Sequence, residues 1–156
     1  MVLMTFHRIT DLDCVYKCLT QSDVYDLITD DFAPPPEEFK VNDHPDIWYL
    51  GVNSKVDFVG LFTLIPDSEI CWQVHAVMFC WSKKPDRRDS ARELIPWLAQ
   101  HTECKRLIAA VPAFNRLAIA FGTHGLGMHI VGKHEKAFMK YGKLHDLILM
   151  GRAIGG

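Results

Sequence analysis

The chain has 156 residues, of which 49% are hydrophobic and 23% are charged, and its formal net charge at pH 7 is −2. This length predicts one domain over residues 1–156, which would bury about 70% of the unfolded chain's surface. The small net charge argues against nucleic acid or a membrane as a partner held by bulk electrostatics, and no run approaches the roughly 18 apolar residues of a membrane span. The five cysteines lie mostly in apolar runs, which predicts reduced, buried thiols in a cytoplasmic chain.

The histidines do not form a metal-binding pattern. His124, His129 and His134 are spaced by five residues, and if residues 128–138 form a strand, His129 and His134 face opposite sides of the sheet. The sequence contains neither Cys-x-x-Cys nor His-Glu-x-x-His. We therefore expect no metal site.

The first half predicts two helices on the way into a sheet. A short strand is expected over 3–9, followed by helices over 10–19 and 22–32 that Thr10 and Ser22 would cap. Three consecutive prolines predict an irregular, extended loop over 33–45. Strands are expected over 47–52, 56–65 and 70–81, and the alternation of the last one places His75 on the same face as Val77.

The second half alternates helices with strands. A basic loop over 82–88 precedes a helix over 89–101, which Asp89 or Ser90 would cap. A strand (106–111), a helix led by Asn115 (114–124) and a hairpin with strands 128–139 and 144–152 complete the chain. The order predicts a mixed α/β fold, because helices between strands allow a parallel crossover.

The last third carries a recurring series of residues: Asn115, Gly125 or Gly127, Gly132, Gly142 and Asp146. In this order the chain resembles the GNAT (GCN5-related N-acetyltransferase) superfamily, and its short form also resembles acetyltransferase-like proteins of bacteriophages. The resemblance implies a mixed sheet with splayed strands 4 and 5, helices on both faces, and acetyl-CoA lying in the V between those strands.

For the segment after strand 5, the resemblance places Asn115 beside the pantetheine arm of the coenzyme, and the glycines would turn the chain sharply through positive φ. The alternative is that Asn115 only caps a helix and that the glycines end it.

The family's pyrophosphate motif, Arg/Gln-x-x-Gly-x-Gly/Ala, is only partly present. Arg88 matches its first position, Ala91 replaces the central glycine, and the other register, starting at Arg87, fits no better. The resemblance implies that backbone amides at a helix start and nearby cationic side chains hold the pyrophosphate. The candidate residues are Arg87, Arg88, Asp89, Ser90, Ala91 and Arg92, and the alternative is a solvated basic loop.

Acetyl transfer also needs a polarised thioester and a base. The resemblance assigns the first role to backbone N–H groups around Phe79, Cys80 and Trp81. His75 is the candidate base because its ordinary pKa of about 6.5 suits an amine proton, with Glu69 as the alternative. His75 could instead be a hydrogen-bonded core residue. The tyrosine that often serves as acid in the family is Gly122 here, so no acid is assigned.

Four acidic residues surround the proline run: Asp30, Asp31, Glu37 and Glu38. An acidic rim favours a cationic acceptor, although a solvated loop would have the same composition. We therefore expect an acetyl-CoA-dependent N-acetyltransferase that modifies a cationic amine, either a small molecule such as a polyamine or a protein lysine or α-amine. The alternative is a catalytically degenerate GNAT-fold binding protein that acts through a protein partner. The acceptor and the oligomeric state, a homodimer included, stay open.

Overall fold

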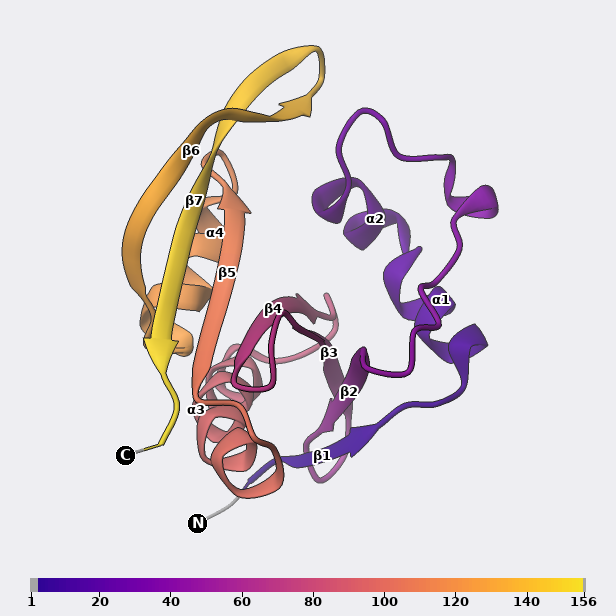
Figure 1. Ribbon diagram of the computed structural model, residues 1–156. Coiled ribbons are helices and arrows are strands. Elements are labelled where there is room, and N and C mark those ends of the chain that lie inside the picture. Colours follow the sequence, from indigo (N-terminus) through magenta and orange to yellow (C-terminus); the bar gives the residue numbers. More distant parts are fainter. Residues whose placement is uncertain (1–2, 156) are drawn as a thin grey trace.

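A single seven-stranded mixed sheet organises the computed structural model, which describes residues 3–155 (Figure 1). The strands are β1 (Thr5–Arg8), β2 (Trp48–Asn53), β3 (Phe58–Pro66), β4 (Cys71–Met78), β5 (Arg106–Pro112), β6 (His129–Lys140) and β7 (Lys143–Ala153). The α-helices are α1 (Leu12–Leu19), α2 (Ser22–Ile28), α3 (Lys84–His101) and α4 (Arg116–Ala120). The strand order is β1-β2-β3-β4-β5-β7-β6, and every neighbouring pair is antiparallel except β4 and β5.

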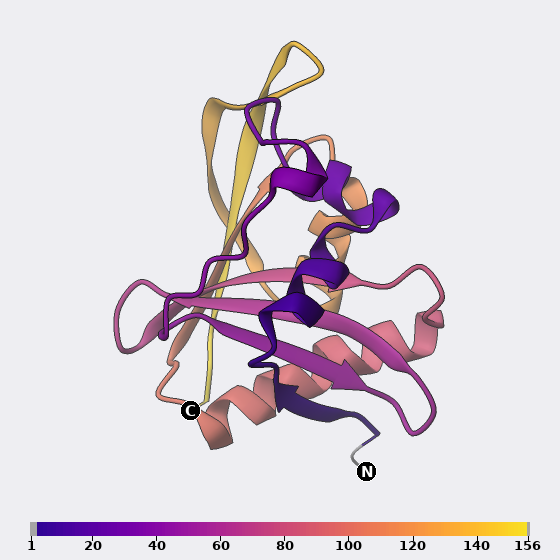
Figure 2. The ribbon, with the colours of Figure 1, turned by 90° about the vertical axis from the view of Figure 1, so that its right-hand side faces the viewer.

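Helices cover both faces of the sheet, as the resemblance implied (Figures 1 and 2). On one face, α3 packs its apolar side, including Leu94 and Leu98, against β2–β5. On the other face, α1 buries Val15 against β3 and β4 in a second cluster that also contains Phe79. No helix within residues 3–155 is both long and apolar enough to cross a membrane.

The parallel pair at the centre of the sheet is short. β4 and β5 are in register only at Cys71↔Arg106, Trp72↔Leu107 and Gln73↔Ile108. Beyond these positions, β4 continues with β3 while β5 continues with β7, and the two halves of the sheet separate (Figure 1). The expected splay between strands 4 and 5 is therefore confirmed.

Several predicted helix boundaries are wrong. The cap of α1 is Asp11, whose carboxylate accepts the Asp13 N–H at 3.0 Å, and α2 ends at Ile28 rather than at residue 32. Gln21 precedes α2, so Ser22 is its first residue and not its cap. The proline run is also less irregular than predicted, because Pro36–Glu38 forms one 3-10 turn.

The largest correction concerns α3, which begins at Lys84 instead of Asp89 or Ser90. Proline is favoured in the first helical turn, where its missing N–H costs no hydrogen bond and its fixed φ suits the helix, so Pro85 starts the helix early.

The glycines after α4 have two different roles. The helix continues into a π-helical turn over Phe121–Gly125, and among these glycines only Gly127 has a positive φ, +72°. A Cβ on Gly122 would lie 2.7 Å from Met150 Cε, and one on Gly125 would lie 3.0 Å from Ala91 Cβ. Gly122 and Gly125 thus allow close packing, and the prediction that they turn the chain through positive φ is wrong.

Candidate functional site

The splay leaves the middle of the sheet open on both faces. β4 and β5 are central strands, yet His75 and Ala76 on β4 and Ala110 on β5 are exposed. Because successive side chains of a strand point to opposite faces, exposure of both His75 and Ala76 means that both sides are accessible. A thioester could therefore approach from one face and an acceptor from the other.

His75 lies inside the diverging segment, opposite Thr63 of β3. Its side chain shares the face of Val77, which packs in the cluster beneath α1. The ring is exposed to solvent but surrounded at longer range by protein, and this desolvation lowers the pKa of His75 below its ordinary 6.5. The imidazole is therefore neutral near pH 7 and can accept a proton.

Glu69, the alternative base, lies in the turn before β4, where its carbonyl accepts the indole N–H of Trp72. This turn is at the closed end of the splay, before the three residue pairs that join β4 to β5. The structure therefore separates the two candidates, and only His75 lies within the opening.

Of the three backbone amides expected to polarise the thioester, that of Phe79 is occupied, and roles for those of Cys80 and Trp81 stay predictions. The Phe79 N–H donates to Val59 O across β3 at 3.0 Å, so the prediction that Phe79 polarises the thioester is wrong. Because N–H directions alternate along a strand, Met78 and Ala76 direct their amides toward the edge from which β5 diverges. Sequence reasoning missed these two residues, although the same alternation could have indicated them once β3 was known to be a neighbour.

The segment after β4 is held by Arg87. Its guanidinium donates to Ser82 Oγ and Ser82 O, both at 2.8 Å, and to the carbonyls of Phe79 and Cys80, both at 3.3 Å. Arg87 is thus occupied in ordering its own loop, and the prediction that its side chain binds the pyrophosphate is not supported. The same loop exposes Cys80 and Trp81, and the Trp81 indole donates to Phe58 O at 2.9 Å.

The early start of α3 changes which amides are available for an anion. Asp89, Ser90, Ala91 and Arg92 lie inside the helix, where Ser90 and Ala91 are buried, so the prediction that amides around these residues open the helix is wrong. The Ser90 hydroxyl donates to Asp86 O at 2.7 Å, which leaves it no free hydrogen for a phosphate.

The actual first turn is Lys84 to Asp86, with exposed cationic side chains around it. Pro85 has no N–H, so Lys84 and Asp86 carry the amides that point out of this helix end. Lys83, Lys84 and Arg88 are exposed beside this turn, and Arg92 is exposed one turn further along the helix. The positive charge of the predicted site is present, although it surrounds a different set of amides.

Asn115 lies at the start of α4, as expected. Its side-chain oxygen accepts the Ala118 N–H at 3.2 Å, so the residue is the helix cap that the alternative reading described. Contact of Asn115 with a pantetheine arm stays a prediction.

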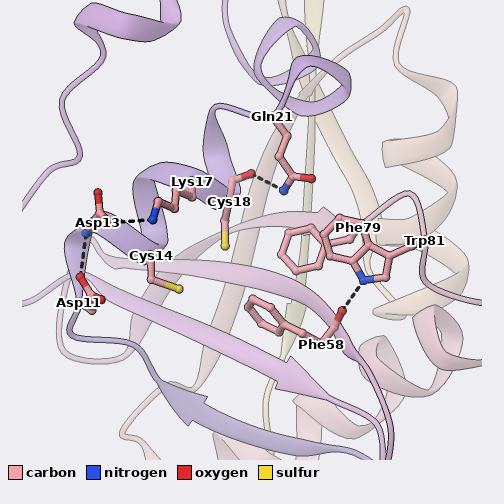
Figure 3. Close-up of a pocket in the computed structure, with 9 residues that line it drawn as sticks. All are labelled: Asp11, Asp13, Cys14, Lys17, Cys18, Gln21, Phe58, Phe79 and Trp81. Atoms are coloured by element: carbon pink, nitrogen blue, oxygen red, sulfur yellow. Dashed lines mark hydrogen bonds and ion pairs between the residues drawn. The ribbon is translucent and has the colours of Figure 1, made fainter.

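A cavity of about 430 Å³ lies beside the end of β4, and Figure 3 shows the residues that line it. They are Asp11, Asp13, Cys14, Lys17, Cys18, Gln21, Phe58, Phe79 and Trp81. Burial raises the pKa of the Cys18 thiol to about 12, and Lys17 forms an ion pair with Asp13 at 3.1 Å. A thiol that stays protonated is a poor nucleophile, so Cys18 is not a candidate nucleophile. Within residues 3–155, no three His, Cys, Asp or Glu side chains are grouped to hold a metal ion.

Solved structures match nearly the whole of this architecture. The acetyltransferase of GNAT family from Streptococcus pneumoniae superposes with a TM-score of 0.69 at 16% identity, covering 97% of this chain and 99% of that one. The chain has the GNAT fold.

Two further structures with the GNAT fold resemble the chain more closely by TM-score. Spermidine N-acetyltransferase from Vibrio cholerae, in complex with CoA and spermine, has a TM-score of 0.75 at 13% identity, covering 97% of this chain and 96% of that one. The Salmonella typhimurium acetyl transferase that modifies the N-terminal serine of ribosomal protein L7/L12 also has a TM-score of 0.75, at 11% identity, covering 99% and 97%. No protein-family profile matches the sequence, and no curated protein is similar to it at a significant level.

Proposed function

We propose that this chain is an acetyl-CoA-dependent N-acetyltransferase that acts on a cationic amine. The observation that carries the proposal is the splay itself, which is open on both faces and contains His75. It is supported by structures with the same fold whose substrates are amines, one a polyamine and the other a protein N-terminus. Both kinds of acceptor are cationic at neutral pH.

The proposed reaction uses the residues of β4. The neutral amine attacks the thioester carbonyl, the C–N bond forms, and the C–S bond then breaks to release the thiolate. His75 takes the proton that the amine loses, directly or through one water molecule. The amides of Ala76 and Met78 are the donors available to the carbonyl oxygen as negative charge develops on it. Water protonates the thiolate, since Gly122 provides no acidic side chain.

Coenzyme binding is assigned to the first turn of α3. A pyrophosphate placed there would accept from the free amides of this turn and lie near Lys83, Lys84 and Arg88. This site lies at the end of the loop that Arg87 orders, so the loop's fixed conformation positions the charges.

Thermal unfolding with and without millimolar acetyl-CoA tests the proposal. A ligand at 100 times its Kd stabilises the native state by about 2.7 kcal/mol, and each kcal/mol raises Tm by roughly 2–4 °C for a domain near this size. Arg88→Glu should shrink the shift because the reversed charge repels the pyrophosphate. Lys105→Glu, a matched reversal at an exposed site beyond the other end of α3, should leave it unchanged.

The rival function is a GNAT-fold binding protein without catalysis. Two observations favour it: Gly122 packs tightly against Met150 where an acid would be needed, and Arg87 is committed to its own loop. Absence of any Tm shift at all acetyl-CoA concentrations would leave the rival standing. Release of free CoA thiol in the presence of an amine would rule it out.

A further inference from the structure

The tip of the β6–β7 hairpin is built around an acidic side chain from the other half of the molecule. Tyr141 and Gly142 form the turn with consecutive positive φ angles of 51° and 72°, the conformation of a type I′ hairpin. Both of their N–H groups donate to the Asp31 carboxylate at 2.8 Å, and the Asp31 N–H donates to Met139 O at 3.0 Å. The turn therefore binds one carboxylate through two successive amides.

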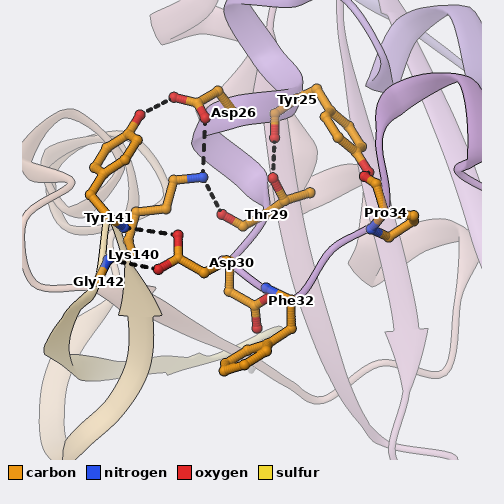
Figure 4. Close-up of polar contacts among 10 residues, drawn as sticks. Tyr25, Asp26, Thr29, Asp30, Phe32, Pro34, Lys140, Tyr141 and Gly142 are labelled. Carbon is orange, nitrogen blue, oxygen red and sulfur yellow. Dashed lines mark hydrogen bonds and ion pairs between the residues drawn. The ribbon is translucent and has the colours of Figure 1, made fainter.

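Lys140 makes the second half of this contact, as Figure 4 shows. Its ammonium donates to Thr29 O at 2.7 Å and lies 3.2 Å from Asp26 Oδ1, while the Tyr141 hydroxyl donates to Asp26 Oδ2. Only 5% of Lys140 is exposed, and lysine is rarely buried unless it is paired. These contacts are specific rather than incidental. We call them the latch: Asp26, Thr29 and Asp31 on one side, Lys140, Tyr141 and Gly142 on the other.

The latch joins two parts of the molecule that separate elsewhere. β4 and β5 part after three residue pairs, and the strands on either side carry the two halves away from each other. The latch joins α2 and the loop after it to the tip of the β6–β7 hairpin. These two segments belong to opposite halves of the molecule (Figure 1). His75 shares the face of Val77, which packs with residues of α1 and α2, so the latch lies on the same side of the sheet as His75.

The β6–β7 ladder is also irregular just before the hairpin tip. The register of β6 with β7 is irregular between His134 and Phe138, and Lys136 in this interval has a φ of +51° and donates its N–H to Asp146. The ladder is therefore disrupted at this interval, so the pairs of the hairpin tip, which begin at Phe138↔His145, are separated from the rest of the β6–β7 ladder. Asp26 is 59% exposed, so water replaces its lost partners when the contact opens.

We propose that the latch is a gate over the acceptor side of the splay, an inference that rests on the proposed function. Closed, it joins the two halves of the molecule around a bound amine. Open, it widens the approach to His75. A slim, unbranched amine reaches His75 past the closed gate, whereas a bulky amine, such as a peptide N-terminus, needs the gate to open.

Two measurements test the latch without any turnover. In Asp31→Ala and Lys140→Met, the Tyr141 and Gly142 amides should exchange hydrogen at least about tenfold faster than in the wild type, because their acceptor or its neighbouring contacts are lost. Lys143→Met, an exposed lysine across the same turn, is the control and should change nothing. In a His75→Cys background, a bulky maleimide should label position 75 faster when Asp31→Ala is added, as read by peptide mass spectrometry.

Turnover tests the gate. The ratio of kcat/KM for a peptide amine to that for a slim amine should rise about tenfold in Asp31→Ala and Lys140→Met, and not in Lys143→Met. An unchanged ratio together with unchanged labelling would overturn the gate, even if the protein proves to be an acetyltransferase. Faster labelling in a protein that does not respond to acetyl-CoA would instead support the gate and reject the enzyme.

Discussion

At the scale of single residues, His75 is the side chain on which the proposed chemistry depends most. Its environment lowers its pKa, so kcat/KM should show an acid limb with a midpoint below 6.5, distinct from the further rise at higher pH as the cationic amine loses its own proton. His75→Gln should remove this acid limb and lower kcat about 10²-fold or more, the usual contribution of a general base, while the acetyl-CoA Tm shift persists. His134→Gln on the exposed strand β6 serves as the control.

An unchanged kcat in His75→Gln would exclude this residue from the proton transfer and leave the amine to lose its proton to solvent.

The lowered pKa of His75 also makes the free energy of unfolding depend on pH. Because its folded pKa is depressed, that contribution is complete above the unfolded value of 6.5 and is lost as pH falls through the folded pKa.

At the scale of elements, two neighbouring arginines that follow the β4–α3 connection have different roles. Arg87 satisfies the carbonyls of its own loop, whereas Arg88 is exposed and lies 3.7 Å from the Asp89 carboxylate. Arg87→Ala should therefore lower the free energy of unfolding by about 1–3 kcal/mol, the cost of leaving partly buried acceptors without a charged donor. Arg88→Ala should change it by less than about 0.5 kcal/mol, because exposed ion pairs contribute little.

Urea unfolding of both variants checks this pair, and acetyl-CoA titration of Arg88→Ala checks the proposed role of the exposed arginine. Equal stability of the two variants would show that the Arg87 contacts do not order the loop.

At the scale of the whole molecule, the latch gives stability a dependence on pH. Hydrogen bonds from Gly142 and Tyr141 lower the pKa of Asp31, and those from Tyr141 and Lys140 lower the pKa of Asp26, while Asp30 is the other carboxylate nearby. Carboxylates with depressed pKa stabilise the fold above their ordinary value of 3.8, and this contribution is lost as pH falls through the folded pKa.

The stability difference between wild type and Asp31→Ala should accordingly be largest at neutral pH and shrink below about pH 4, as measured by urea unfolding across a pH series. Glu103→Ala, at an exposed site outside the latch, should show no such convergence. A difference that stays constant down to pH 3 would mean that Asp31 acts through packing and not through its charge.

The sequence by itself determined the order of elements and a mixed sheet, because periodicity and turn residues are local signals, whereas the splay was implied by the resemblance to the GNAT superfamily. Alternation on β4 placed His75 and Val77 on one face, and the Asn115 motif marked the start of α4. Local signals predicted the wrong helix start where a segment can adopt either of two local structures. Pro85 can lie in a basic loop or start a helix, and only the fold shows that it starts α3.

Tertiary structure alone decided which groups are free to act. The decisive contacts join segments that are far apart in the sequence. They are the hydrogen bond from Phe79 to Val59, the packing of Gly122 on Met150 and the pairing of Lys140 with Asp26. No composition or spacing records such contacts, because a hydrogen-bond partner is selected by the packing of whole elements. The sequence therefore indicated where the chemistry lies, while the fold decided which amides, charges and side chains remain available for it.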